Sequence, residues 1–152
     1  DVRKSSTTEA RASSTIKNMM VRQEVVKRMV EHVKNLLTAN LERLSKITDR
    51  VESRIIKVKA AGGDTATSER FLAEARMHLG EARTSIAEFA AIVLTSDKMS
   101  ENVAKLRTAA ADAKEHLGEA RHSLSESIKS LKPGRSDKKE RATTTPPATT
   151  NQ

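Results

Sequence analysis

The sequence contains no cysteine, and this absence excludes disulfides, thiol catalysis and zinc sites built on thiolates. Aromatic residues are also scarce, with two Phe, no Trp and no Tyr among 152 residues. Because large rings normally fill the centre of a globular domain, a core of Leu, Ile, Val, Met and Ala favours thin helical layers. No apolar run approaches the roughly 20 residues that a membrane-spanning helix needs, so no transmembrane segment is expected.

Charged residues of both signs make up 32% of the chain, which is typical of long solvated helices. The net charge of +8 is unevenly distributed. Residues 1–60 carry 14 basic and 7 acidic side chains (+7), residues 61–131 carry 9 and 11 (−2), and residues 132–152 carry 5 and 2 (+3). The first segment and the tail are therefore basic, and the middle is nearly neutral.

A single long helix is predicted over residues 14–60, where Ser13, Ser14 or Thr15 can cap its start and Gly62-Gly63 can end it. Residues 1–13 are rich in Ser, Thr, Arg and Ala without periodicity, so we expect them to be disordered. The helix shows an apolar stripe at helical spacing. Its members are Ile16, Met19, Val26, Val30, Val33, Leu37, Leu41, Leu44, Ile47, Val51, Ile55 and Val58.

Two further helices are predicted over residues 67–94 and 99–131, separated by Thr95-Ser96-Asp97. Their apolar residues follow heptads. The first of the two helices has Leu72, Leu79, Ile86 and Val93 at a and Ala75, Ala82 and Phe89 at d; the second has Val103, Ala110, Leu117 and Leu124 at a and Leu106, Ala113 and Ala120 at d. The basic, Thr/Pro-rich tail over residues 132–152 is predicted to be disordered.

The two helices also contain an internal copy, because His-Leu-Gly-Glu-Ala-Arg occurs at residues 78–83 and again at 116–121. An antiparallel hairpin turning at Ser96 would set Leu against Ala in three of four expected a–d pairs. The expected pairs are Leu79 with Ala113, Ala82 with Ala110, Leu72 with Ala120 and Ala75 with Leu117. The sequence thus predicts an all-α fold: a long N-terminal helix on an antiparallel hairpin, as a coiled-coil-like three-helix bundle.

Basic side chains gather along one flank of this hairpin, and like charges there need an acidic neighbour. Glu42, Asp49 and Glu52 of the first helix can supply it and complete the bundle. Alternatively, the flank binds an anion such as a phosphate or a polysaccharide carboxylate. The anion-binding candidates are Arg76, Arg83, Arg107, Lys114 and Arg121.

On the other flank, His78 and His116 become neighbours across the hairpin, and each has a carboxylate four residues earlier, Glu74 and Asp112. Two imidazoles and two carboxylates from facing helices can hold a divalent metal or act as a proton switch. The alternative is that these residues are ordinary solvent-facing helical pairs. His32 and His122 belong to neither arrangement.

The first helix is longer than the hairpin, since residues 14–60 would extend about 70 Å and residues 67–94 about 42 Å. We therefore expect residues 16–33 to project beyond the hairpin turn with an uncovered apolar stripe. Either a second copy pairs with it, or the helix breaks near residues 38–40 and folds back, or the stripe lies on an anionic membrane. The partner-binding candidates are Ile16, Met19, Val26, Val30 and Val33.

The Ala-rich helices, for example FLAEARMHLGEARTSIAEFAA at residues 71–91, a start at Asp1 without methionine and the closing TTTPPATT resemble the alanine-rich surface coat proteins of trypanosome parasites. That resemblance implies a rod-like helical bundle, export after removal of a signal peptide, and a possible lipid anchor at the cell surface. The composition alone is equally compatible with the cytoplasm.

The sequence contains no nucleophile elbow, phosphate loop or metalloprotease motif, so no enzymatic activity and no cofactor are predicted. The leading hypothesis is a structural or interaction protein that acts through its helix surfaces. Nonspecific binding of anionic polymers, such as nucleic acid or surface polysaccharide, is the alternative that the pI of about 10.0 supports. Specific nucleic-acid binding is not expected, because no aromatic stacking platform or helix-turn-helix pattern is found.

Overall fold

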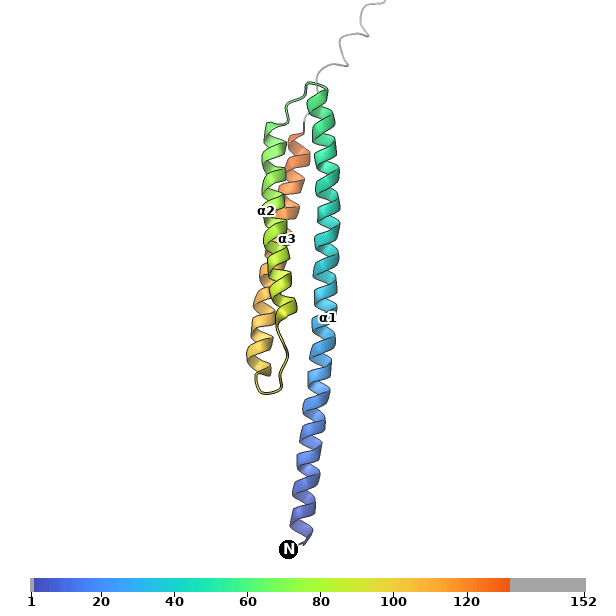
Figure 1. The fold of residues 1–152 in the computed structure, drawn as a ribbon, viewed down its shortest axis with the longest axis vertical. Coiled ribbons are helices and arrows are strands. Elements are labelled where there is room, and N and C mark those ends of the chain that lie inside the picture. The colour runs from blue at the N-terminus through green and yellow to red at the C-terminus, as the bar shows by residue number, and fades with distance from the viewer. Residues whose placement is uncertain (1, 132–152) are drawn as a thin grey trace, which may run out of the picture.

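The computed structural model describes the backbone of residues 2–131 and the side chains of residues 10–131. Within this part there are three helices, α1 (Val2–Ala60), α2 (Ala66–Ala91) and α3 (Met99–Ser130). Helices α2 and α3 form an antiparallel hairpin, and α1 runs along it and beyond its turn (Figure 1). The predicted all-α architecture is confirmed, and α1 is continuous through residues 38–40, where a break was the alternative.

The end of α1 is formed by the two glycines that the sequence singled out. Gly62 has a φ of +78°, the left-handed conformation that glycine adopts without steric strain. The Gly62 amide donates to the Lys59 carbonyl at 3.0 Å, and the Gly63 amide donates to the Val58 carbonyl at 2.9 Å. This pair of bonds is the Schellman motif, and it turns the chain back so that α2 runs antiparallel to α1.

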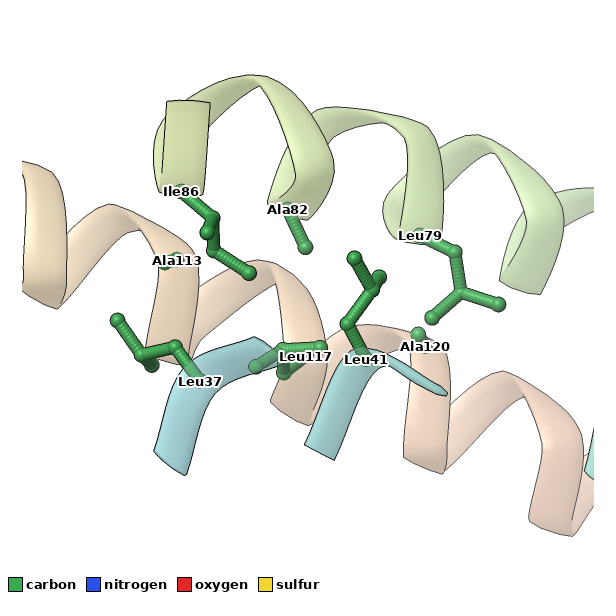
Figure 2. Close-up of a cluster of buried hydrophobic side chains, with 8 residues drawn as sticks. All are labelled: Leu37, Leu41, Leu79, Ala82, Ile86, Ala113, Leu117 and Ala120. Atoms are coloured by element: carbon green, nitrogen blue, oxygen red, sulfur yellow. The ribbon is translucent and has the colours of Figure 1, made fainter. Parts of the chain in front are cut away.

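The core lies where the three helices meet, and it alternates large and small side chains as the heptads predict. Ala75, Ala82, Ala113 and Ala120 are fully buried, so α2 and α3 can approach closely. Leucines and isoleucine fill the space between them and α1. Figure 2 shows this central cluster, which consists of Leu37, Leu41, Leu79, Ala82, Ile86, Ala113, Leu117 and Ala120.

The predicted helix boundaries were wrong at two places. Helix α1 begins at Val2, whereas residues 1–13 were expected to be disordered; residues 2–13 contain neither Gly nor Pro, so helix propagation continues at one hydrogen bond per residue. Residue 1 and the tail over residues 132–152 lie outside the described residues. Helix α2 ends at Ala91 rather than at 94, so Val93, predicted in the core, is 72% exposed.

The turn between α2 and α3 extends the hairpin along α1. Asn102 Nδ2 donates to the Val93 carbonyl at 2.8 Å, while Ile92 and Leu94 pack against the cluster of Phe89, Leu106 and Ala109. Gln23 of α1 reaches the Leu94 carbonyl at 3.4 Å. The hairpin therefore covers α1 from about this point onward, and no helix of the described part is long and apolar enough to cross a membrane.

Candidate functional site

The internal copy brings His78 of α2 and His116 of α3 face to face. Their ring centroids are 6.2 Å apart and their planes differ by 25°. Because the copies run antiparallel, equivalent residues are related by an approximate two-fold axis between the helices, and the two histidines lie next to it. The predicted pairing of the histidines is confirmed.

The carboxylate that joins the two histidines is Glu81. Its Oε2 lies 3.0 Å from His78 Nδ1 and 3.1 Å from His116 Nδ1, so one oxygen contacts both rings. One potential ligand atom from each of the three side chains can be chosen so that all lie within 4.8 Å of one another. The side chains are 22%, 30% and 44% exposed for His78, His116 and Glu81, so the cluster is half-buried and open to solvent.

The sequence pattern grouped the two histidines with Glu74 and Asp112. Neither of these two acids is a member of the cluster in the structure, where Glu81 takes their place. Helical side chains lean towards the N-terminus of their helix. Glu81, one turn after His78, leans back over that ring, whereas Glu74, one turn before it, leans away. The signal for Glu81 was present in the sequence, since the copied segment includes a glutamate three residues after each histidine.

Asp112 instead lines a groove between α2 and α3, and none of the three cluster residues lines this groove. Three of the eight residues that line this groove carry carboxylates, and the groove has a volume of about 430 Å³. Its ionisable lining residues are Glu88, Glu101, Asp112 and Lys105. Its ionisable lining consequently carries more acidic than basic side chains.

The arginine flank lies on the side that faces α1. Arg76 Nη2 forms an ion pair with Glu52 Oε2 of α1 at 2.7 Å, and Arg83 shares an open groove with Asp49. Glu42 lies in a groove lined by α1 residues alone. For Arg76, the acidic neighbour from the first helix is thus confirmed, and an anion need not be invoked to neutralise it.

The remaining anion-binding candidates lie on α3. Arg121 borders a groove of about 470 Å³ together with Arg43 and Asn40 of α1, and none of the residues that line this groove is acidic. Arg107 and Lys114 are exposed to solvent. The five candidates are therefore split between an ion pair, two grooves and the open surface, and they do not form one anion site.

Only part of the expected partner-binding stripe is uncovered. Ile16 and Met19 are 57% and 50% exposed, as predicted for the projecting segment. Val30 and Val33 pack against the cluster at the hairpin turn, and Val26 is partly buried. The expectation that these three valines lack a covering element was wrong. The turn between α2 and α3 carries the hairpin farther along α1 than the lengths of the two helices alone would.

A second apolar line on α1 belongs largely to the uncovered stripe expected over residues 16–33, and only its member Leu36 lies outside that range. Its members recur at spacings of four and seven, so they share one side of the helix, and they are between 51% and 63% exposed. They are Val21, Val25, Met29 and Leu36. This line flanks the hairpin-facing stripe, so an apolar surface continues around α1 to the side that the hairpin leaves open.

Comparison with known proteins gives no match to a protein-family model, to a curated protein or to a solved structure. The functional assignment therefore depends on the geometry of this chain.

Proposed function

We propose that this protein is a non-enzymatic structural protein that associates with a second copy of itself through the exposed apolar surface of α1. The observation that carries the proposal is a group of large apolar side chains, each at least half exposed, in the N-terminal half of α1. They are Ile16, Met19, Met20, Val21, Val25 and Met29. Exposed large apolar side chains gathered in one segment typically mark a contact with another molecule.

The spacing of these residues favours a helix as the partner. Ile16, Met19 and Gln23 continue, at alternating steps of three and four, the line of Val26 and Val30 that packs on the hairpin. A stripe with this spacing buries itself against another helix. Residues 2–22 extend past the hairpin as a helix of about 31 Å, which we call the overhang. Among residues 2–131, which the structure describes, nothing continues the hairpin beside it (Figure 1).

Charge favours a second copy over an unrelated helix. Between residues 10 and 22 the overhang carries Arg11, Lys17 and Arg22 and no acidic residue, whereas the hairpin segment over residues 61–131 has a net charge of −2. In an antiparallel dimer, the overhang of one copy lies beside the turn end of the other copy's hairpin, where Glu88, Asp97 and Glu101 outnumber Lys98 and Lys105. Opposite charges then meet across the contact, while the apolar lines of the two α1 helices cover each other.

Sedimentation equilibrium of the full chain over a range of concentrations tests this proposal. We expect a reversible dimer that weakens as salt is raised, since part of the attraction is between exposed charges. Met19→Glu combined with Val25→Glu places charge on both apolar lines and should give a monomer. Ile56→Glu is the matched control, because Ile56 is 61% exposed on the same helix but lies away from the overhang.

Other outcomes would identify other partners. A monomer at all concentrations that binds vesicles of anionic lipid, and loses this binding in the double variant, would replace the second copy with a membrane surface. A monomer that binds DNA and heparin alike, with strong salt dependence, would favour the anionic-polymer alternative. Either result contradicts self-association.

A location at the cell surface is part of the proposal, supported by the resemblance of the Ala-rich helices to surface coat proteins. Labelling of intact source cells with a membrane-impermeant lysine reagent tests it. Labelling equal to that of a cytoplasmic marker would contradict it.

A further inference from the structure

We propose that His78, Glu81 and His116 form a binding site for a divalent transition-metal ion of the Zn²⁺ type, and that Glu119 supplies a fourth ligand. The donors are two imidazole nitrogens and a carboxylate oxygen, a set that Zn²⁺ accepts readily. Nothing in the proposed self-association requires this site. It lies on the hairpin, whereas the association surface lies on α1.

The distances match the size of such an ion. Four ligands held tetrahedrally at about 2.0–2.1 Å from Zn²⁺ are separated from one another by about 3.4 Å. Glu81 Oε2 lies 3.0 and 3.1 Å from the two Nδ1 atoms, and the three donors can all be within 4.8 Å. An outward shift of the glutamate by a few tenths of an ångström opens the space for the ion, and a half-exposed side chain can make that shift.

Glu119 is assigned by the symmetry of the internal copy. It follows His116 by three residues, as Glu81 follows His78. Because the copies are related by an approximate two-fold axis, Glu119 has the same position relative to His78 that Glu81 has relative to His116. Glu119 is exposed, so a rotamer change can bring its carboxylate towards the rings without moving the backbone.

The surroundings favour a cation. Asp112, four residues before His116 on the same helix, lines a groove together with Glu88 and Glu101, with Lys105 as the only basic lining residue. Without an ion, Glu81 Oε2 accepts a hydrogen bond from His78 Nδ1 and lies 3.1 Å from His116 Nδ1, so it restrains both rings. The imidazoles are consequently held together before an ion arrives, which lowers the entropy lost on binding.

An ion at this position would connect α2 to α3 near the middle of the hairpin. Binding to the folded chain alone stabilises it by mass action. Since the two ligand pairs belong to different helices, the effect should appear as a higher unfolding temperature of the hairpin. It should not depend on α1 self-association, so the association variant Met19→Glu/Val25→Glu should bind metal normally.

Calorimetric titration of the untagged full chain with Zn²⁺ tests the site, and the visible absorption of Co²⁺ reports the ligand geometry. We expect one ion per chain and tetrahedral Co²⁺ bands. His78→Ala and His116→Ala should each weaken binding by more than about 100-fold, since loss of even an outer-shell partner weakens it by about 10–100-fold. The matched controls are His32→Ala and His122→Ala, which remove exposed histidines outside the cluster.

A separate pair of variants tests the role of Glu119. Glu119→Gln should weaken Zn²⁺ binding by about 10-fold or more, while Glu115→Gln, which removes an exposed glutamate of the same helix, should leave it unchanged. Equal Zn²⁺ affinities for these two variants would contradict the assignment of Glu119 as the fourth ligand. No heat and no change in unfolding temperature with the intact chain, or equal binding by the histidine variants and their controls, would overturn the site itself.

Discussion

Ser68 and Ser127 exchange a reciprocal pair of hydrogen bonds across the open end of the hairpin. Each hydroxyl donates to the backbone carbonyl of the other residue at 2.8 Å, and both residues are fully buried. The sequence-based register would have placed Ser68 opposite Leu124 instead. Two small polar side chains therefore fix the alignment of α2 and α3 where the leucine–alanine layers alone would permit a shift.

Substitution at Ser68 should reveal this role. Ser68→Ala removes one hydrogen bond without filling space, so we expect a loss of about 1 kcal/mol in the free energy of unfolding. Ser68→Val places extra methyl groups where the helices are closest and should lower stability further, by about 1–3 kcal/mol from overpacking. Urea unfolding followed by circular dichroism measures both. A neutral Ser68→Val would mean that the helices are not in close contact there.

The two mid-helix glycines should behave differently from the glycine in the turn. A Cβ added at Gly80 or Gly118 meets nothing within 4 Å, so neither glycine is needed for close approach of a helix. Gly80→Ala and Gly118→Ala should each raise the free energy of unfolding by about 1 kcal/mol through helix propensity. Gly62→Ala should lower it by about 1–2 kcal/mol, because Gly62 has a positive φ. Thermal and urea unfolding test whether the two mid-helix substitutions raise stability while the Gly62 substitution lowers it.

The heptads predicted the hairpin well because large and small residues alternate on both copies, and an antiparallel pairing is the arrangement in which they fit. The heptads could not predict that Val93 is exposed, since α2 ends where Phe89 and Ile92 turn inward to close the core. The same turn hides Val30 and Val33, which looked uncovered when only helix lengths were compared. The Glu81 contact depends on side-chain direction along a helix, which residue spacing alone does not convey.

The junction between α1 and α2 should be sensitive to acid. A hydrogen bond from Lys59 and a second from Thr65 hold the pKa of Glu69 below its ordinary value of 4.5. A carboxylate whose pKa is lower in the folded state stabilises the fold above its unfolded pKa and loses this contribution as the pH falls through its folded pKa. The contribution is therefore complete near pH 7 and is lost below about pH 4.5.

Glu69→Gln removes the ionisable group, so the difference in unfolding temperature between the intact chain and this variant should be present at pH 7 and smaller at pH 3. Glu115→Gln, which alters an exposed glutamate of α3, serves as the control. Some acid sensitivity should remain in Glu69→Gln, because Lys129 also lowers the pKa of Glu126. A temperature difference that persists unchanged at pH 3 would contradict the ionic contribution.

Two adjacent leucines of α1 offer a sharp comparison of its packed and open sides. Leu37 is 3% exposed in the central cluster, whereas Leu36 is 51% exposed on the second apolar line. Leu37→Ala opens a cavity between α1 and the hairpin and should lower the free energy of unfolding by about 2–5 kcal/mol. Leu36→Ala should change it by no more than about 0.5 kcal/mol. Urea unfolding at low protein concentration, where the monomer dominates, measures both values. Equal effects would mean that α1 is not docked on the hairpin in solution, and the apolar surface assigned to self-association would then have to be redrawn.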